Sequence, residues 1–266
     1  MIKKILITAA VAASASFATW DFLPLLEAGK GTAEAGLYYD WDDEWSQAGI
    51  NIAGRYTVIP NLEISIPGFG VQFWGETDCN GCANGGGGLR DLTIGGRYEV
   101  APMAAVFLDL RLPIGTHDDD GVGTTQPGSD EFAMYFGGQF HMGVKEAPGL
   151  VFGAEAGLDW GFEHDNSERG LELHMGGEID YTIPNVGLTP YLGLKFKLQI
   201  TEDTWEGADG KEYGNDDDFD HDQFLFWLGA SYALNQQFDV KAQLIFRNGD
   251  MDGDATGFYV ACGFKF

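Results

Sequence analysis

The segment FYVACGFKF, Phe258–Phe266, decides the fold that we expect for this chain. Alternate positions share one face of an extended segment, and that face carries Phe258, Val260, Cys262, Phe264 and Phe266. Small or polar side chains lie between them, which is the period of a β-strand and not of a helix. Because the sequence ends within this strand, the strand must pair with another part of the chain.

The first 18 residues have the pattern of a secretory signal peptide. Lys3 and Lys4 precede an apolar run, and Ala15–Ala18 resembles a cleavage site. We therefore expect residues 1–18 to be a signal peptide and residues 19–266 to form one domain. No later segment supplies the roughly twenty apolar residues of a membrane helix. The mature chain is then either a soluble exported β-protein or a closed membrane barrel.

The leader and the final aromatic strand together look like a bacterial outer-membrane β-barrel. Phe266 resembles the terminal signal that the barrel-assembly machinery reads, so we expect that machinery, outer-membrane lipid and lipopolysaccharide as partners. The composition agrees, since 44% hydrophobic residues coexist with 39 glycines and a mean hydropathy of −0.13. A net charge of −26 argues against nucleic acid as a partner.

About twelve segments of strand length follow one another, joined by alternately short and long links. The short links have the chemistry of tight turns and lie at residues 59–61, 101–102, 145–149, 184–187 and 235–237. The longer, acidic and glycine-rich links lie at residues 40–44, 77–87, 115–130, 163–168, 202–220 and 248–254. This alternation predicts a single antiparallel, all-β transmembrane barrel with both termini in the periplasm.

The residues on the two faces favour the barrel over a soluble sandwich. Residues 190–201 place leucines, Phe196 and Ile200 on one face, and Tyr191, Gly193, Lys195, Lys197 and Gln199 on the other. Aromatic residues concentrate near segment ends, where the two membrane interfaces of a barrel would lie. The alternation slips between Ile66 and Phe69, so we predict a β-bulge at Pro67–Gly68.

One block of the sequence resembles a known family. It comprises Gly88–Tyr98, Leu112–Gly115, Gly121–Thr124 and Pro127–Ser129. The block is similar to the outer-membrane transporter family labelled "MetA-pathway of phenol degradation", which has a Gly-x-x-Asp-Leu strand start and a Leu-Pro-x-Gly strand exit. The resemblance implies a barrel for small solutes, including aromatic or apolar compounds. Ile114 departs from the family pattern, where a small hydroxyl residue is commoner.

Charged residues on the inward face are the candidate selectivity residues. The basic ones are Arg55, Arg97, Arg111, Lys195, Lys197, Lys241 and Arg247. The acidic ones are Asp109, Glu155, Asp159, Glu172, Glu178, Asp180 and Asp239, and by the same parity Glu34, Glu63, Asp91 and Glu99 also point inward. Opposed rows of such charges across a water-filled pore would select polar solutes. Alternatively, the charges pair and fill the interior, as in small barrels.

The remaining motifs are weaker. Asp250, Asp252 and Asp254 offer hard oxygen ligands for calcium but lack the glutamate that completes an EF-hand loop. The Asp and His residues at 218–221 and 118–120 have the residue types of an omptin-like protease without that family's spacing, so we expect no enzyme. Cys79 and Cys82 could form a small disulfide. We expect no cofactor and no resident metal.

The sequence thus predicts an outer-membrane channel for passive passage of small solutes. The alternative is a structural or adhesive barrel with a filled lumen that acts through its acidic loops.

Overall fold

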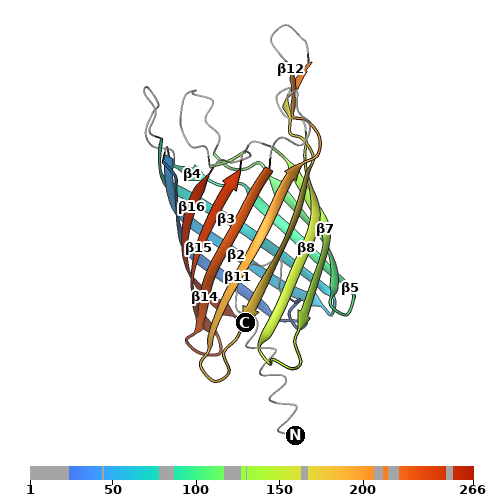
Figure 1. Cartoon of the computed structure of the whole chain (residues 1–266), viewed down its shortest axis with the longest axis vertical. Helices are drawn as coiled ribbons and strands as arrows, with labels where there is room; N and C mark the ends of the chain where they lie inside the picture. The colour runs from blue at the N-terminus through green and yellow to red at the C-terminus, as the bar shows by residue number, and fades with distance from the viewer. Residues whose placement is uncertain are drawn as a thin grey trace.

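A computed structural model describes residues 24–43, 45–77, 87–116, 127–129, 131–162, 167–206, 212–214, 222–249 and 254–266. The predicted signal peptide, residues 1–18, lies outside these ranges, as does the Cys79–Cys82 motif. The described chain is all β-structure (Figure 1). Within it, no helix has the length and apolar character needed to cross a membrane.

Twelve antiparallel strands form a closed barrel, as the sequence predicts. Each strand pairs with its neighbours along the chain, and β1 also pairs with β16, which closes the sheet. The strands are β1 (Gly31–Trp41), β2 (Trp45–Ile59), β3 (Leu62–Thr77), β5 (Leu92–Ala101), β6 (Ala104–Leu112), β7 (Ala133–Gly143), β8 (Leu150–Gly161), β10 (Glu172–Tyr181), β11 (Leu188–Gln199), β14 (Asp222–Ala233), β15 (Phe238–Gly249) and β16 (Ala255–Lys265).

Four short strands supplement the barrel. β4 (Gly88–Leu89) extends the pairing of β3. β9 (Ser167–Glu168), β12 (Thr204–Glu206) and β13 (Glu212–Gly214) form a separate three-stranded sheet that stands beyond the long-link end of the barrel (Figure 1). The sequence pattern assigned these residues to loops, because pairing between two distant links leaves no local signal.

The short links are tight turns at the predicted positions. Asn61 and Asn185 adopt positive φ angles of 80° and 65°, a conformation that asparagine tolerates better than most residues. The final strand is paired on both edges, and the carbonyl and amide of Phe266 bond to Gly31 at 2.9 and 3.0 Å. The C-terminus therefore lies at the short-turn end of the barrel (Figure 1).

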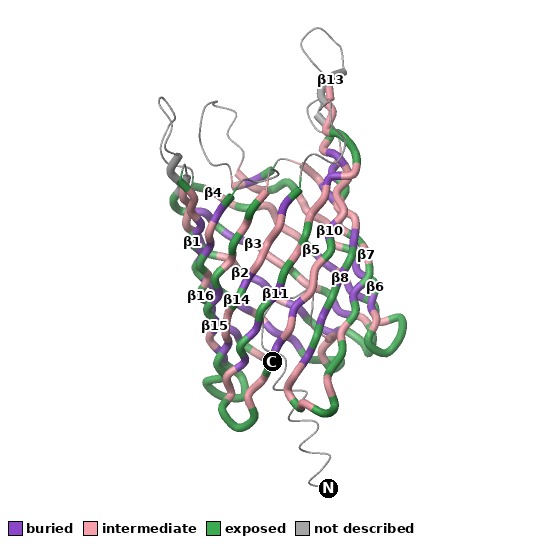
Figure 2. Tube along the Cα trace, viewed as in Figure 1, coloured by how far each residue is buried: buried purple, intermediate pink, exposed green. Residues whose placement is uncertain are grey.

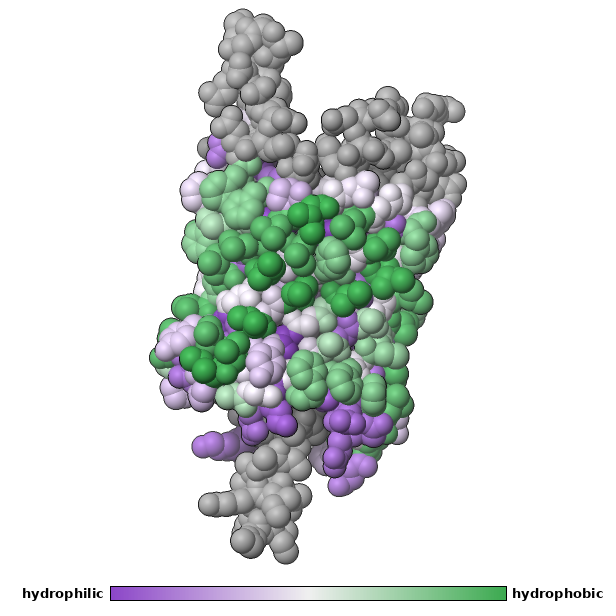
Figure 3. Space-filling model, turned by 180° about the vertical axis from the view of Figure 1, so that it is seen from behind, coloured by the Kyte–Doolittle hydropathy of each residue, from purple (hydrophilic) through white to green (hydrophobic). Residues whose placement is uncertain are grey.

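The two faces of the wall differ in the way that a transmembrane barrel requires. Burial alternates along most of the wall (Figure 2), as in β1, β8 and β16, and the exposed positions carry large apolar side chains such as Leu37, Phe73 and Leu192. Figure 3 shows the resulting apolar surface on one side of the wall. Exposed aromatic residues mark both edges of this band, with Trp74 and Trp160 at the long-link end and Tyr56 and Tyr98 at the short-turn end.

The predicted bulge is present. Gly54 faces Ile66 and Ile52 faces Phe69, so Pro67 and Gly68 of β3 together face Ala53 of β2. A bulge of this kind bends the strand and disrupts its ladder locally. Pro67 suits the position because it has no backbone N–H to contribute.

Candidate functional site: the barrel lumen

A buried ion-pair cluster lies in the lumen near the short-turn end. Glu63 of β3 has a fully buried carboxylate that accepts bonds from Arg97 of β5 and lies 3.7 Å from the guanidinium of Arg55 of β2. The hydroxyl of Thr57 donates to the same carboxylate at 3.3 Å. These side chains are buried in an interior of limited water access, so each charge depends on its partner.

The segment before β1 completes this cluster. The carbonyl of Pro24 accepts a bond from Arg55 at 3.2 Å, and the amide of Leu26 lies 3.4 Å from the Glu63 carboxylate. Pro24, Leu25 and Leu26 are half-buried. The chain therefore passes along the inner wall before it enters the barrel sheet at Gly31.

The polar network continues around the wall. Arg97 donates to the Gln139 side chain at 3.2 Å, and Gln139 donates to Glu155 at 3.2 Å. Glu155 also accepts bonds from Tyr135 at 2.6 Å and from Lys195 at 2.9 Å. The charges thus pair along the wall, between strands that are adjacent or that have one strand between them.

The opposite part of the wall repeats this arrangement. Lys241 of β15 lies 2.9 Å from Glu34 of β1, which also accepts a bond from the Tyr259 hydroxyl at 2.7 Å. Lys265 lies 3.1 Å from Asp239. We call these pairs, together with the chain of bonds from Arg55 to Lys195, the inner belt.

A second cluster lies at the long-link end. The guanidinium of Arg169, in the link between β8 and β10, contacts Asp159 at 2.6 Å, Glu131 at 3.2 Å and Glu172. Burial disfavours the charge on Arg169, but the three carboxylates outweigh burial and raise its pKa. Glu172 also contacts His174 at 2.6 Å.

This second cluster contains the one group of potential metal ligands found in the described chain. The ligand atoms of Asp159, Glu172 and His174 lie within 4.8 Å of one another. Arg169 already forms ion pairs with both carboxylates, so this arrangement fits a guanidinium better than a metal ion.

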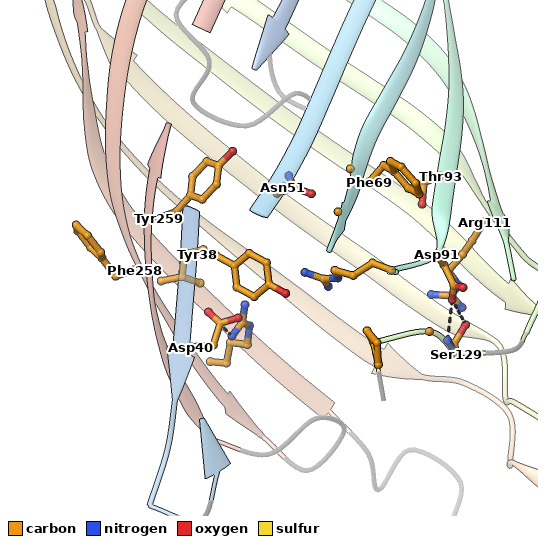
Figure 4. Close-up of a pocket in the computed structure, with 17 residues that line it drawn as sticks. Tyr38, Asp40, Asn51, Phe69, Asp91, Thr93, Arg111, Ser129, Phe258 and Tyr259 are labelled. Carbon is orange, nitrogen blue, oxygen red and sulfur yellow. Dashed lines mark hydrogen bonds and ion pairs between the residues drawn. The ribbon is translucent and has the colours of Figure 1, made fainter. Parts of the chain in front are cut away.

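A cavity of about 740 Å³ crosses the lumen on the long-link side of the inner belt. Its lining includes Tyr38, Asp40 and Tyr259 on one side, and Phe69, Asp91, Thr93 and Arg111 on the other (Figure 4). Its volume lies in the range of roughly 300–1,000 Å³ that is typical of small-molecule sites. The lining mixes aromatic rings with charged groups, a combination that contacts both apolar and polar parts of a solute.

The sequence block that carries the family resemblance assembles beside this cavity. The carboxylate of Asp91 accepts bonds from the Gly115 amide at 2.9 Å and from the Ser129 amide and hydroxyl at 2.7 and 2.6 Å. Thr116 bonds to Leu89 in both directions. Asp91 therefore holds the ends of the link between β6 and β7 against the inner wall.

Several aromatic rings lie flat on the inner wall over glycines of the neighbouring strand. A methyl group built on Gly193 would clash with Trp227, one on Gly229 with Tyr191, and one on Gly36 with Tyr259. The Trp227 indole N–H also donates to Glu178. Glycine is required at these positions because the rings occupy the space of a side chain.

The predicted selectivity residues all lie on the inward face and are buried or half-buried. Of those not yet placed, Arg247 lies 3.4 Å from Asp40 and Arg111 lies 3.4 Å from Glu131. Asp180 is buried, two residues from Glu178 on β10. The side chains of Asp109 and Ser65 both lie over Gly95, which is on the strand between them. Lys197 is paired with His174 of the adjacent strand.

Sequence reasoning missed three contributors, namely Arg169, Glu131 and the segment before β1. Arg169 and Glu131 lie in links where charge is usually solvated, and nothing local marks them. The candidate calcium ligands Asp250 and Asp252 lie outside the described residues, whereas Asp254 accepts bonds from Asn248 and Gly249 of its own hairpin. The Asp and His residues of the protease alternative also lie outside the described ranges.

Comparisons with known proteins agree with this architecture. No match was found among curated protein sequences. The fold is similar to that of an outer membrane channel from Pseudomonas putida F1, with a TM-score of 0.73 and 13% identity over 94% of this chain and 100% of that one. The NanC porin gives a TM-score of 0.50 and 12% identity over 88% and 100% of the two chains.

A third structure shows that this fold serves more than one purpose. The translocator domain of the autotransporter NalP from Neisseria meningitidis gives a TM-score of 0.54 and 11% identity over 100% and 95% of the two chains. Likeness at this level establishes an outer-membrane barrel fold but no particular activity.

The family model described as "Putative MetA-pathway of phenol degradation" matches residues 12–251. Because this match covers most of the 266 residues, the chain belongs to that family.

Proposed function

We propose that this protein is an outer-membrane channel for passive passage of small solutes, including small aromatic or apolar compounds. The observation that carries the proposal is the cavity of about 740 Å³ inside a closed barrel with an apolar exterior. Membership of the family and the fold shared with an outer membrane channel support it. The aromatic and charged lining of the cavity suits small molecules of mixed polarity.

We place the short-turn end and both termini in the periplasm, with the long links and the β9–β12–β13 sheet outside the cell. In bacterial barrels the short turns face the periplasm and the longer loops face outward. The partners would be outer-membrane lipid and lipopolysaccharide around the apolar band, and the barrel-assembly machinery at Phe266. The inner belt would act as the selectivity element, because fixed charges lining a narrow pore act on every solute that passes.

Single-channel recording of the purified protein in planar bilayers tests the proposal. Discrete current steps in KCl are expected for an open lumen. Folding is verified beforehand by the heat-dependent mobility of the barrel on a gel. A folded protein that gives no current steps would instead support the filled, structural barrel.

Ion selectivity then tests the belt. In Lys195→Glu, a second carboxylate lies beside Glu155 on the wall, so the reversal potential in a KCl gradient should shift toward cation selectivity. Lys145→Glu is the matched control, since Lys145 is exposed in the turn between β7 and β8. An equal shift in both variants would show that Lys195 does not line the path.

A further inference from the structure

The charges that line the lumen cavity differ from those of the chain as a whole. The sequence has 41 acidic residues but only 15 lysines and arginines. Among the described residues of the cavity lining this balance is reversed, because Arg90, Arg111 and Arg247 outnumber the carboxylates of Asp40 and Asp91. The cavity therefore favours an anion inside an otherwise acidic protein.

Two of the three guanidinium groups already have carboxylate partners. Arg247 lies 3.4 Å from Asp40, and Arg111 lies 3.4 Å from Glu131. Within the part of the chain that the structure describes, Arg90 forms no ion pair with a carboxylate. Arg90 is thus the guanidinium of the lining whose charge is left for a solute.

Arg90 extends across the lumen instead of lying along the wall. Its amide bonds to the carbonyl of Gly70 at 2.8 Å, which fixes its backbone beside β3. Its guanidinium lies 5.2 Å from the centroid of the Tyr38 ring on β1, although β3 and β2 separate β4 from β1 in the sheet. Arg90 is exposed, and contact with the face of a ring leaves N–H donors of a guanidinium for other partners. These donors are available to a solute in the cavity.

Aromatic rings line the cavity beside this charge. The rings of Tyr38, Tyr259 and Phe69 all belong to the lining (Figure 4). Tyr38 and Tyr259 lie against the wall over Gly49 and Gly36, where a methyl group would clash with them. A planar solute ring can pack on such rings in an offset or edge-to-face arrangement. The cavity volume of about 740 Å³ leaves room for a compound with one ring.

These two features together fit one class of solute. A carboxylate can accept two parallel N–H bonds from a guanidinium, and such charge-assisted bonds are among the strongest that side chains form. A neutral aromatic compound would contact the rings but leave Arg90 without a counterion, and a cation would be repelled by the guanidinium groups. Asp40 and Asp91 already accept bonds from other groups of the protein, so neither competes for Arg90.

We propose that the lumen cavity binds small aromatic carboxylates, with Arg90 holding the carboxylate and the neighbouring aromatic rings contacting the ring of the solute. This inference rests on the proposed channel function and names the class of solute that the channel selects. The acidic long links repel anions in general, so the selection depends on contact with Arg90 and not on the long-range field.

Binding of radiolabelled benzoate to the purified protein in non-ionic detergent tests this site. Benzoate joins one carboxylate to one ring, benzamide has a similar shape without the charge, and acetate has the charge without the ring. In equilibrium dialysis, benzoate should bind saturably. Unlabelled benzamide and acetate should displace it only at concentrations about tenfold or more above that of unlabelled benzoate.

Arg90→Gln should weaken benzoate binding roughly tenfold to a hundredfold, because it removes the charged donors. Arg90→Lys keeps the charge without the planar pair of donors, so its loss should be smaller. Lys145→Gln is the matched control, since it changes the net charge equally in the exposed turn between β7 and β8. Arg247→Gln should weaken binding less than Arg90→Gln, because Arg247 is paired with Asp40. The heat-dependent mobility of each variant on a gel verifies its folding.

Three results would overturn this site. Folded protein that binds no benzoate saturably would remove it. Equal displacement by benzamide and benzoate would show that the carboxylate is not recognised. The same benzoate affinity in Arg90→Gln as in Lys145→Gln would show that Arg90 does not hold the carboxylate.

KCl current in planar bilayers separates the site from the channel. Discrete current steps that benzoate blocks in the parent protein, and blocks more weakly in Arg90→Gln, would support both. Current steps without benzoate binding would remove the site and leave the channel. Benzoate binding that depends on Arg90, in a folded protein without current steps, would keep the site and remove the proposed passage of solutes.

Discussion

Replacing Glu63 by glutamine should cost the barrel more stability than any comparable change in an exposed ion pair. The Glu63 carboxylate is fully buried between Arg55 and Arg97, whose side chains are only 2% and 6% exposed. Glu63→Gln keeps the shape of the side chain and removes the negative charge that faces two buried guanidinium groups. Breaking a buried pair on one side typically costs about 3–5 kcal/mol, so we expect the free energy of unfolding to fall by that amount.

Urea unfolding of the protein in lipid vesicles, followed by tryptophan fluorescence, measures this change. Arg111→Gln is the control, because the side chains of the Arg111–Glu131 pair are 31% and 17% exposed, and a pair that is partly solvated contributes less to stability than a fully buried one. Adding Arg97→Gln to Glu63→Gln should recover part of the loss, since it removes one of the two buried positive charges that faced Glu63. If Glu63→Gln costs no more than Arg111→Gln, the belt is solvated and the reasoning is wrong.

Three further changes test other parts of the lumen. Deletion of residues 24–28 removes the half-buried segment that contacts Arg55 and Glu63, so single-channel conductance should rise; an unchanged conductance would place the segment outside the ion path. Arg169→Ala removes the guanidinium from the carboxylates of Asp159 and Glu172, which lie beside His174. Micromolar Zn²⁺ should therefore block the current of this variant but not that of the parent protein. Adding His174→Ala to Arg169→Ala should abolish the block. Gly193→Ala should displace the Trp227 ring and lower the unfolding free energy, whereas Gly138→Ala, with open space on the lipid face, should have little effect in the same urea titration.

Most of the fold could be predicted from local patterns in the sequence. Alternation in segments such as Phe258–Phe266 and 190–201 reports directly which side chains share a face, because the period of a strand does not depend on its partners. The parity slip between Ile66 and Phe69 predicted the bulge at Pro67–Gly68 for the same reason. Parity also placed every candidate selectivity residue on the inward face.

The contacts between charged side chains on different strands could not be predicted from the sequence pattern. Glu63 and Arg97 are 34 positions apart, and Tyr259 and Glu34 are 225 apart, so their contacts depend on register and closure of the sheet. Parity alone places both signs in one lumen and cannot say which charges neighbour each other. The separation of β4 from β5 at Arg90 and Asp91 has no local sequence signal, because Asp91 bonds to Gly115 and Ser129, which lie far along the chain.

The glycines beneath the lumen aromatics set the usable width of the bore. Strand number fixes the diameter of the backbone cylinder, but large inward side chains decide how much of that diameter a solute can use. Recessing Trp227 against Gly193 and Tyr191 against Gly229 keeps bulky rings close to the wall. A barrel of this design can therefore be narrowed or widened by single exchanges between glycine and alanine, without changing its strand number or any of its charges.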